Sequence, residues 1–212
     1  MPKIKYLIIA GPIGVGKSTL TQRLAAEGFQ PLFEEPDINP YLADFYADQS
    51  RAFETQLAFL GHRLQQCRRV ADLLAAGQRV VQDRSMAEDS YIFTRHHYQQ
   101  GLISERDYQT YQTLYQGLAD FVPKADLIVY LSAPVPVLQD RIRERGRDYE
   151  QEIAADYLQD LNGLYTQWAQ ACRQTRQPFV ELPTAGSRHP EEIAQQVLAL
   201  LQPEARRVLR SA

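Results

Sequence analysis

Short apolar runs alternate along the chain with longer stretches in which apolar residues recur every three or four positions. The short runs predict five strands, at Lys5–Ala10, Gln30–Phe33, Arg79–Gln82, Leu127–Leu131 and Phe179–Glu181. The longer stretches predict helices near Ser18–Glu27, Asn39–Ala47, Arg51–Ala76, Arg84–Gln99, Ser104–Phe121, Val135–Arg145, Ile153–Thr175 and Pro190–Leu201. Strands that alternate with helices form parallel sheets with helical crossovers, so the pattern predicts an α/β fold.

One predicted helix, Arg51–Ala76, is unusually long and amphipathic. Its apolar residues at helical spacing are Phe53, Leu57, Leu60, Leu64, Cys67 and Leu74, and Gly77 supplies a stop signal. No linker interrupts the pattern, so we expect a single domain over residues 1–212, with a polar, basic tail after residue 203 that frays.

Charge and cysteine content narrow the function classes. The 212-residue chain has a formal net charge of −3, which argues against nucleic acid or an anionic membrane as the main partner. Its two cysteines do not have metal-ligand or redox spacing, and reduced thiols of this kind predict a cytoplasmic protein. No apolar run approaches the length of a transmembrane helix.

The segment between the first strand and the first helix reads Gly-Pro-Ile-Gly-Val-Gly-Lys-Ser over residues 11–18. A Gly-x-x-x-x-Gly-Lys-Ser pattern in this context predicts a phosphate-binding P-loop, whose glycines let backbone N–H groups surround phosphate oxygens. Lys17 would reach the β and γ phosphates, and the Ser18 hydroxyl would bind Mg²⁺. We expect the nucleotide to contact Gly11, Gly14, Val15, Gly16, Lys17, Ser18 and Thr19. An ordinary glycine-rich turn is the alternative.

Two further polar clusters follow the second and third predicted strands. Glu34 and Glu35 precede Pro36, at the strand end that faces the ligand crevice of a parallel sheet; a carboxylate there could accept a proton from a hydroxyl. Asp83 ends the third strand, where a P-loop enzyme places a Mg²⁺-binding carboxylate, and Arg84 could hold the transferring phosphoryl group. The alternatives are a solvated acidic turn and a helix N-cap.

Two helical segments carry candidate ligand-binding side chains. Four arginines between residues 141 and 147 suit either a solvated helix end or a lid, at about 141–151, that closes over phosphates. Gln56, Phe59 and Arg63 share one face of the long helix, where an amide could bond a nucleobase and a ring could stack on it. A helix face that meets solvent or a dimer partner is the alternative.

In order and spacing, these fragments resemble the deoxyribonucleoside kinases, in particular the bacterial deoxyadenosine and deoxyguanosine kinases. The resemblance covers residues 5 to about 170 and rests on the P-loop, Glu-Glu-Pro at 34–36, Asn-Pro-Tyr-Leu at 39–42, Asp-Arg-Ser at 83–85, Glu-Asp at 88–89 and the arginine run. It implies a three-layer α/β/α P-loop kinase with a five-stranded parallel sheet and an arginine-rich lid. It also implies ATP and Mg²⁺ as cofactors and a homodimer packed through the helices near 51–76 and 84–99.

The resemblance implies a role for each matching residue. Glu35 would be the general base for the sugar 5′-hydroxyl, Arg84 would hold that hydroxyl, and Asp83 would lie near Mg²⁺. Tyr46 and Glu150 would bind the 3′-hydroxyl. The base would be read by Gln56, Arg63 and Asp89 beside Phe59, and the lid arginines would be Arg141, Arg145 and Arg147. An Arg63–Asp89 ion pair would suit adenine or guanine first and cytosine second.

Three alternative functions agree less well with the sequence. A nucleoside monophosphate kinase such as thymidylate kinase shares the P-loop and an Asp-Arg pair, but it would place basic residues where this chain has Glu35, because its acceptor is a phosphate. A GTPase would need an Asn-Lys-x-Asp motif, which the chain lacks. A non-catalytic nucleotide-binding scaffold would be expected to lose Lys17, Glu35 or Arg84, and all three are present.

Overall fold

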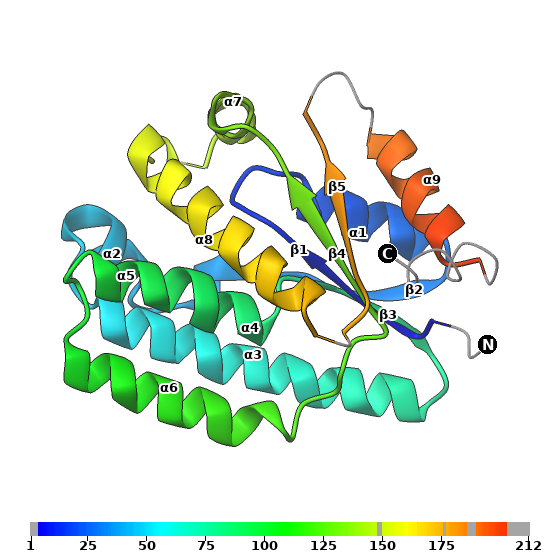
Figure 1. Cartoon of the computed structure of the whole chain (residues 1–212), viewed down its shortest axis with the longest axis horizontal. Helices are drawn as coiled ribbons and strands as arrows, with labels where there is room; N and C mark the ends of the chain where they lie inside the picture. Colours follow the sequence, from blue (N-terminus) through cyan, green and yellow to red (C-terminus); the bar gives the residue numbers. More distant parts are fainter. Residues whose placement is uncertain (1–3, 148–149, 176, 186–189, 203–212) are drawn as a thin grey trace.

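A central sheet of five parallel strands organises the structure, a computed structural model that describes residues 4–147, 150–175, 177–185 and 190–202 (Figure 1). The strands are β1 (Tyr6–Ala10), β2 (Phe29–Leu32), β3 (Arg79–Asp83), β4 (Leu127–Ser132) and β5 (Phe179–Pro183). Their order in the sheet is β2-β3-β1-β4-β5, and in register Ile8 lies beside Gln82 on one side and Ile128 on the other. The predicted five-stranded parallel sheet is confirmed.

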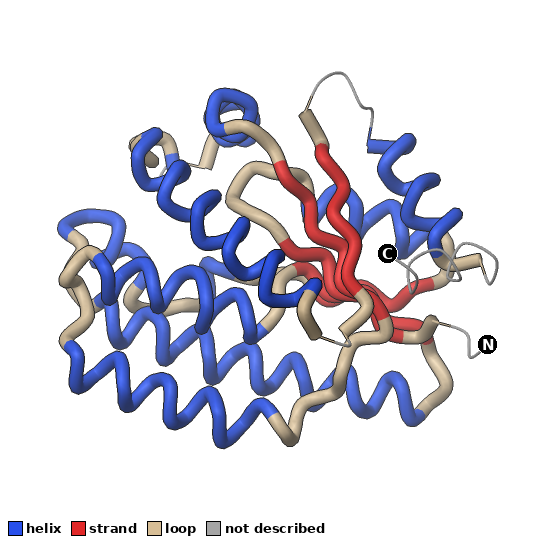
Figure 2. The backbone as a smooth tube through the Cα atoms, in the orientation of Figure 1, coloured by secondary structure: helices blue, strands red, loops and turns tan. Residues whose placement is uncertain are grey.

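Helices connect the strands and cover both faces of the sheet (Figure 2). They are α1 (Lys17–Ala26), the 3₁₀ turn η1 (Pro36–Ile38), α2 (Leu42–Asp48), α3 (Ala52–Ala75), α4 (Met86–Glu88), the π-helix η2 (Asp89–Thr94), α5 (Arg95–Gln99), α6 (Glu105–Ala119), α7 (Val135–Arg145), α8 (Ala155–Arg173) and α9 (Pro190–Leu200). The helix predicted from Asn39 begins later, because Asn39 precedes Pro40 and takes an extended conformation with ψ 111°.

Successive side chains of β1 point to opposite faces of the sheet and show which helices cover each face. Leu7 and Ile9 face a core that includes residues of α1, α7 and α9. Tyr6 and Ile8 face the opposite core, to which α3, η2 and α8 contribute. In Figure 1, α3, α6 and α8 accordingly lie on one side of the sheet, with α1 and α9 on the other. The arrangement has the three expected layers and leaves the carboxyl ends of the strands free to form a site.

The long helix α3 is more polar inside than its sequence pattern predicts. Leu60 and Cys67 of the expected apolar face are buried, whereas Phe53, Leu57, Leu64 and Leu74 are only partly buried. The residues that are buried beside Leu60 and Cys67 include Gln56, Arg63 and Gln66. Since buried polar side chains need partners, this polar stripe marks where α3 meets the site.

The helix predicted over Arg84–Gln99 is a composite of α4, η2 and α5. Arg84 lies outside it with a left-handed φ of 71°, and Ser85 caps it by accepting a hydrogen bond from the Glu88 N–H. The wider turn of η2 interrupts the regular α-helix after α4, and π-helical turns are frequent at functional sites.

Part of the expected lid and all of the expected frayed tail lie outside the described residues. Residues 148 and 149 of the 141–151 segment are among those not described, as are residues 203–212. Of the part that is described, α7 ends at Arg145, and Gly146 caps it with a φ of 72°. Among the described helices, none has the length and apolar character needed to cross a membrane.

Candidate active site

The P-loop joins β1 to α1, and two of its glycines have no room for a side chain. Gly11 has a φ of 145°, and a Cβ there would lie 2.5 Å from the Leu131 carbonyl oxygen. Gly14 has a φ of 80°, and a Cβ there would lie 2.8 Å from the Leu138 carbonyl oxygen. The loop therefore needs glycine at both positions for its shape, as well as for the approach of a ligand to its backbone.

Lys17 and Ser18 begin α1 at the point where the loop closes. The Lys17 side chain is only 6% exposed, and its Nζ donates to the Pro12 carbonyl oxygen at 3.1 Å. Burial and the nearby charge of Arg84 lower the pKa of Lys17 to about 8, against the opposing effect of Asp83, Glu34 and Glu88. A bound anion would reverse this shift, so the lysine is suited to a phosphate.

The residues present fit a Mg²⁺ ion bound together with a nucleotide. The Ser18 hydroxyl donates to Asp83 Oδ2 at 2.5 Å, while the buried Asp83 Oδ1 has no hydrogen-bond partner among the described residues. Those residues contain no group of three or more His, Cys, Asp or Glu side chains placed to hold a metal. Mg²⁺ commonly binds one or two protein oxygens and completes its coordination shell with water and phosphates. The Ser18 hydroxyl and the Asp83 carboxylate form a donor set of this kind.

Two pockets meet over Lys17 and Ser18. One pocket lies against the P-loop, where the phosphate donor is expected, and is named the donor-side pocket; the other is named the acceptor-side pocket. The donor-side pocket has about 1350 Å³ of open space. Of the expected nucleotide-binding residues, it is lined by Gly14, Val15, Gly16, Lys17, Ser18, Thr19, Arg141, Arg145 and Arg147. The acceptor-side pocket has about 780 Å³, and of the expected substrate residues it is lined by Tyr46, Gln56, Phe59, Arg84, Asp89 and Glu150. Lys17, Ser18, Arg145 and Arg147 line both pockets, so a group could pass between them at this point.

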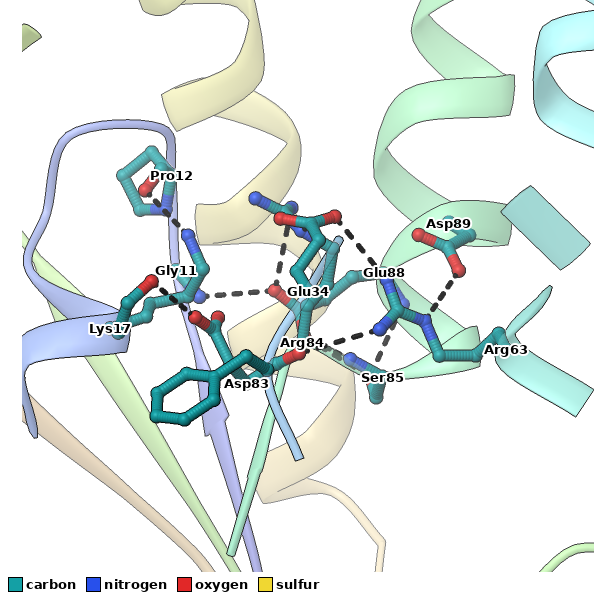
Figure 3. A network of polar contacts seen from close by, with 12 residues as sticks. Gly11, Pro12, Lys17, Glu34, Arg63, Asp83, Arg84, Ser85, Glu88 and Asp89 are labelled. Carbon is teal, nitrogen blue, oxygen red and sulfur yellow. Dashed lines mark hydrogen bonds and ion pairs between the residues drawn. The ribbon is translucent and has the colours of Figure 1, made fainter. Parts of the chain in front are cut away.

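Glu34, and not the expected Glu35, lies in the acceptor-side pocket. The Glu34 carboxylate contacts Arg84 Nε at 2.7 Å and accepts a hydrogen bond from Arg63 at 3.3 Å (Figure 3). Burial raises the pKa of Glu34, but the charges of Arg84 and Arg63 outweigh it and bring that pKa to about 2. Glu35 is exposed and does not line the pocket, because successive side chains of extended backbone point to opposite sides.

Arg84, which lines the acceptor-side pocket, is held by contacts on several sides. Besides Glu34, its guanidinium donates to the Tyr165 hydroxyl at 3.1 Å and lies 4.4 Å from the centre of the Phe93 ring. Its side chain is 4% exposed, and its pKa is raised well above the usual range because nearby acidic groups outweigh burial. The guanidinium is therefore always charged and fixed in direction.

The expected Arg63–Asp89 ion pair is present, with Nε and Oδ2 at 3.0 Å. Arg63 is 2% exposed and lies beneath the pocket instead of lining it, where it joins Asp89 to Glu34. Asp89 and Gln56 do line the pocket, and the Gln56 Oε1 is 3.3 Å from the Thr94 hydroxyl. Asp89 and Gln56 thus present a carboxylate acceptor and an amide to the pocket, with Arg63 as their support.

The arginines expected in a lid differ in how they are held. Arg141 on α7 donates to the Val15 carbonyl oxygen at 3.2 Å and to the Thr184 carbonyl oxygen at 2.8 Å, so it braces the P-loop. Arg145 and Arg147 form ion pairs with Glu150, the latter at 3.2 Å. Glu150 is 4% exposed and lines the acceptor-side pocket together with Tyr46.

Three buried residues near the site were given no role by the sequence reasoning. Glu88 is fully buried and accepts hydrogen bonds from Gly11 N–H at 3.1 Å and Ser85 N–H at 2.9 Å. The Ser-x-x-Glu spacing over residues 85–88 predicts a capping box, but it does not predict the hydrogen bond between Glu88 and Gly11 of the P-loop. Tyr165 and His97 carry no local sequence signal. His97 lines the acceptor-side pocket, and burial lowers its pKa to about 3, so it is neutral at physiological pH.

Comparison with known proteins places these features in one family. The model of the deoxynucleoside kinase family matches residues 7–202. The chain belongs to the deoxynucleoside kinase family. Among its relatives, deoxyadenosine/deoxycytidine kinase of Bacillus subtilis (strain 168) is 37% identical over 79% of this chain and 78% of its own length. Deoxyadenosine kinase of Dictyostelium discoideum is 35% identical over 92% of this chain and 78% of its own length.

The solved structures agree with this deoxynucleoside kinase fold. A structure of deoxyadenosine kinase from M. mycoides with bound dATP has a TM-score of 0.78 and 25% identity, and the match covers 92% of this chain and 99% of that one. The family match and the relatives make this chain a kinase. This finding favours the kinase over the alternative of a non-catalytic scaffold.

Proposed function

We propose that this kinase transfers the γ-phosphate of ATP to the 5′-hydroxyl of a deoxyribonucleoside, in the presence of Mg²⁺, and that deoxyadenosine is its preferred acceptor. The observation that carries the proposal is the carboxylate of Glu34 on the acceptor side of the junction, 2.7 Å from Arg84 Nε. A phosphate acceptor would be repelled by this carboxylate, whereas a neutral hydroxyl can donate to it. The position of this carboxylate therefore favours a nucleoside over a nucleoside monophosphate.

The side chains around the junction divide the work of phosphoryl transfer. Glu34, ionised at neutral pH because its pKa is about 2, orients the 5′-hydroxyl and accepts its proton. Positive charge for the transferring phosphoryl group comes from Lys17, Arg84, Arg145 and Arg147. In the transition state of this reaction, neutralisation of the phosphoryl charge matters more than strong base catalysis. Mg²⁺, held through Ser18 and Asp83, would neutralise the β and γ phosphates when bound.

Base preference follows from the acceptor and donor that reach the pocket. Asp89 can accept from an exocyclic amino group, and the Gln56 amide can donate to a neighbouring ring nitrogen. Adenine offers that pair of groups, and cytosine offers it on a smaller ring. The N7/O6 edge of guanine needs two donors, and Arg63, which would supply the second, lies beneath the pocket. This ranks deoxyadenosine above deoxycytidine and deoxyguanosine.

A coupled kinase assay with ATP·Mg²⁺ tests the proposal. The acceptors are deoxyadenosine, deoxyguanosine, deoxycytidine, thymidine, the matching ribonucleosides and dTMP. We expect the highest kcat/KM with deoxyadenosine and no turnover of dTMP. Turnover of dTMP alone would mean that the acceptor is a phosphate, and it would overturn the role of Glu34.

The oligomeric state and the cellular location stay predictions. We propose a homodimer, on the family resemblance, with the helices near 51–76 and 84–99 at its interface. Light scattering on the purified chain tests it: a dimer has twice the 24.3 kDa of the monomer. A single species at the monomer mass would contradict the dimer without affecting the proposed reaction.

A further inference from the structure

Glu88 is a buried carboxylate that no step of the proposed reaction uses. It is 0% exposed and lines neither pocket, so it has no route to a substrate. Its Oε1 accepts from the Gly11 N–H at 3.1 Å, and its Oε2 accepts from the Ser85 N–H at 2.9 Å and the Ser85 hydroxyl at 3.1 Å (Figure 3). One side chain thereby ties the start of the P-loop to the segment that follows β3.

Tyr165, from α8, connects this carboxylate to Arg84. Its hydroxyl lies 2.8 Å from Glu88 Oε1 and 2.8 Å from the Gly11 carbonyl oxygen, and it accepts a hydrogen bond from Arg84 at 3.1 Å. A phenol has one proton to donate and lone pairs to accept with, so the hydroxyl can serve Arg84 and one of its two acceptors at once. Tyr165 is fully buried and, like Glu88, lines neither pocket.

Arg84 needs such support because its backbone is strained. Its φ of 71° is left-handed, which costs a non-glycine residue about 1 kcal/mol or more and persists only where the surroundings enforce it. The Arg84 N–H donates to the Ile9 carbonyl oxygen at 3.0 Å, which anchors the backbone to β1. The guanidinium end is anchored by Tyr165 and by Glu88, whose nearer oxygen is 3.9 Å away.

We infer that Glu88 and Tyr165 are positioning residues that fix Arg84 relative to the P-loop, so that the donor phosphates and the acceptor hydroxyl are held in one geometry. The inference rests on the proposed function, since Arg84 matters only if a group passes between the two pockets. It explains why a carboxylate and a phenol are buried together behind the junction, where apolar side chains would pack at lower cost. Both residues act through Arg84 and neither touches substrate.

The test is a double-mutant cycle between Tyr165→Phe and Arg84→Gln, read in kcat. Tyr165→Phe removes only the hydroxyl, and we expect kcat to fall by about 10-fold or more while the Kd values for ATP and deoxyadenosine change by less than about threefold. In the Arg84→Gln background, the same substitution should change kcat by less than about twofold, because the residue it acts through is already gone.

Tyr130→Phe is the matched control. The Tyr130 ring is buried and stacks on Tyr165 with ring centres 5.5 Å apart, but its hydroxyl has no part in the network. We expect kcat within about twofold of the wild type. Glu88→Gln is a second variant: its amide would present a donor to Gly11 or Ser85, so it should lower kcat in the same way.

Two results from the variants would overturn the inference. Additive losses in the cycle would show that Tyr165 acts independently of Arg84, and a loss confined to ATP affinity would show that Tyr165 supports only the P-loop. If the wild type phosphorylates no nucleoside, the proposed function fails and the inference fails with it. That outcome is distinguished from the first two because it appears in the wild type, before any variant is compared.

Discussion

Replacing Glu34 by glutamine removes one negative charge from the acceptor side of the junction and little volume. In the folded protein this carboxylate faces Arg84 Nε at 2.7 Å and Arg63 at 3.3 Å, and both arginines keep other partners when it is gone. The variant should therefore fold. Loss of one partly exposed ion-pair partner should lower the free energy of unfolding by about 1.5 kcal/mol, which corresponds to a Tm lower by roughly 3–6 °C.

The effect on turnover should be much larger than the effect on folding. General bases contribute about 10²–10⁴-fold, and the loose transition state of phosphoryl transfer places this reaction at the low end. We expect kcat to fall by about 10²–10³-fold, equal to roughly 2.7–4 kcal/mol of transition-state stabilisation. Because the pKa of Glu34 is about 2, wild-type kcat/KM should show no acid limb from this residue between pH 5 and pH 8.

Glu35→Gln is the matched control, since it makes the same chemical change one residue along the chain. Glu35 is exposed and outside the pocket, so kcat should stay within about twofold of the wild type. Both variants are measured in the coupled assay with deoxyadenosine, and their folding is compared by thermal unfolding. A large loss in Glu35→Gln together with normal turnover in Glu34→Gln would refute the assignment from geometry and restore Glu35 as the base.

Three further predictions concern ionisation and the base. Lys17, with a pKa of about 8, should take up about half a proton when ATP binds at pH 8, measured by calorimetry in buffers of different ionisation enthalpy; uptake unchanged in Lys17→Arg would contradict this. His97, whose pKa falls from 6.5 to about 3 on folding, should cost the wild type about 1.4 kcal/mol of stability between pH 7.5 and pH 5.5, since the unfolded chain binds the proton. The free energy of unfolding of His97→Gln, measured with urea, should not show this decrease. An equal dependence of that free energy on pH in the variant and the wild type would refute the prediction. Asp89→Asn should weaken the preference for deoxyadenosine more than it lowers the best kcat, and an unchanged acceptor profile would remove Asp89 from base recognition.

The sequence predicts the scaffold of this kinase well because the scaffold depends on local signals. The apolar runs at β1 and β3 have the length of buried strands, and the P-loop pattern lies between a strand and a helix. Each of these features can be recognised within about ten residues. The parallel sheet follows from their order along the chain.

The sequence reasoning fails where the outcome depends on the direction of a side chain or on distant partners. Glu34 and Glu35 are chemically identical neighbours, and only the path of the chain after β2 determines which one meets Arg84. The link between Glu88 and Tyr165 joins positions 77 residues apart. The left-handed φ of Arg84 has no signature in the residue type, because it is enforced by contacts from other elements.

The central claim is that the acceptor is a nucleoside hydroxyl and not a phosphate. The most direct measurement compares the initial rate of dAMP formation from deoxyadenosine with that of dADP formation from dAMP, each with ATP·Mg²⁺. The carboxylate of Glu34 predicts fast formation of dAMP, identified as the 5′-phosphate by ³¹P NMR, and no formation of dADP. Formation of dADP from dAMP, with deoxyadenosine left unchanged, would contradict the account.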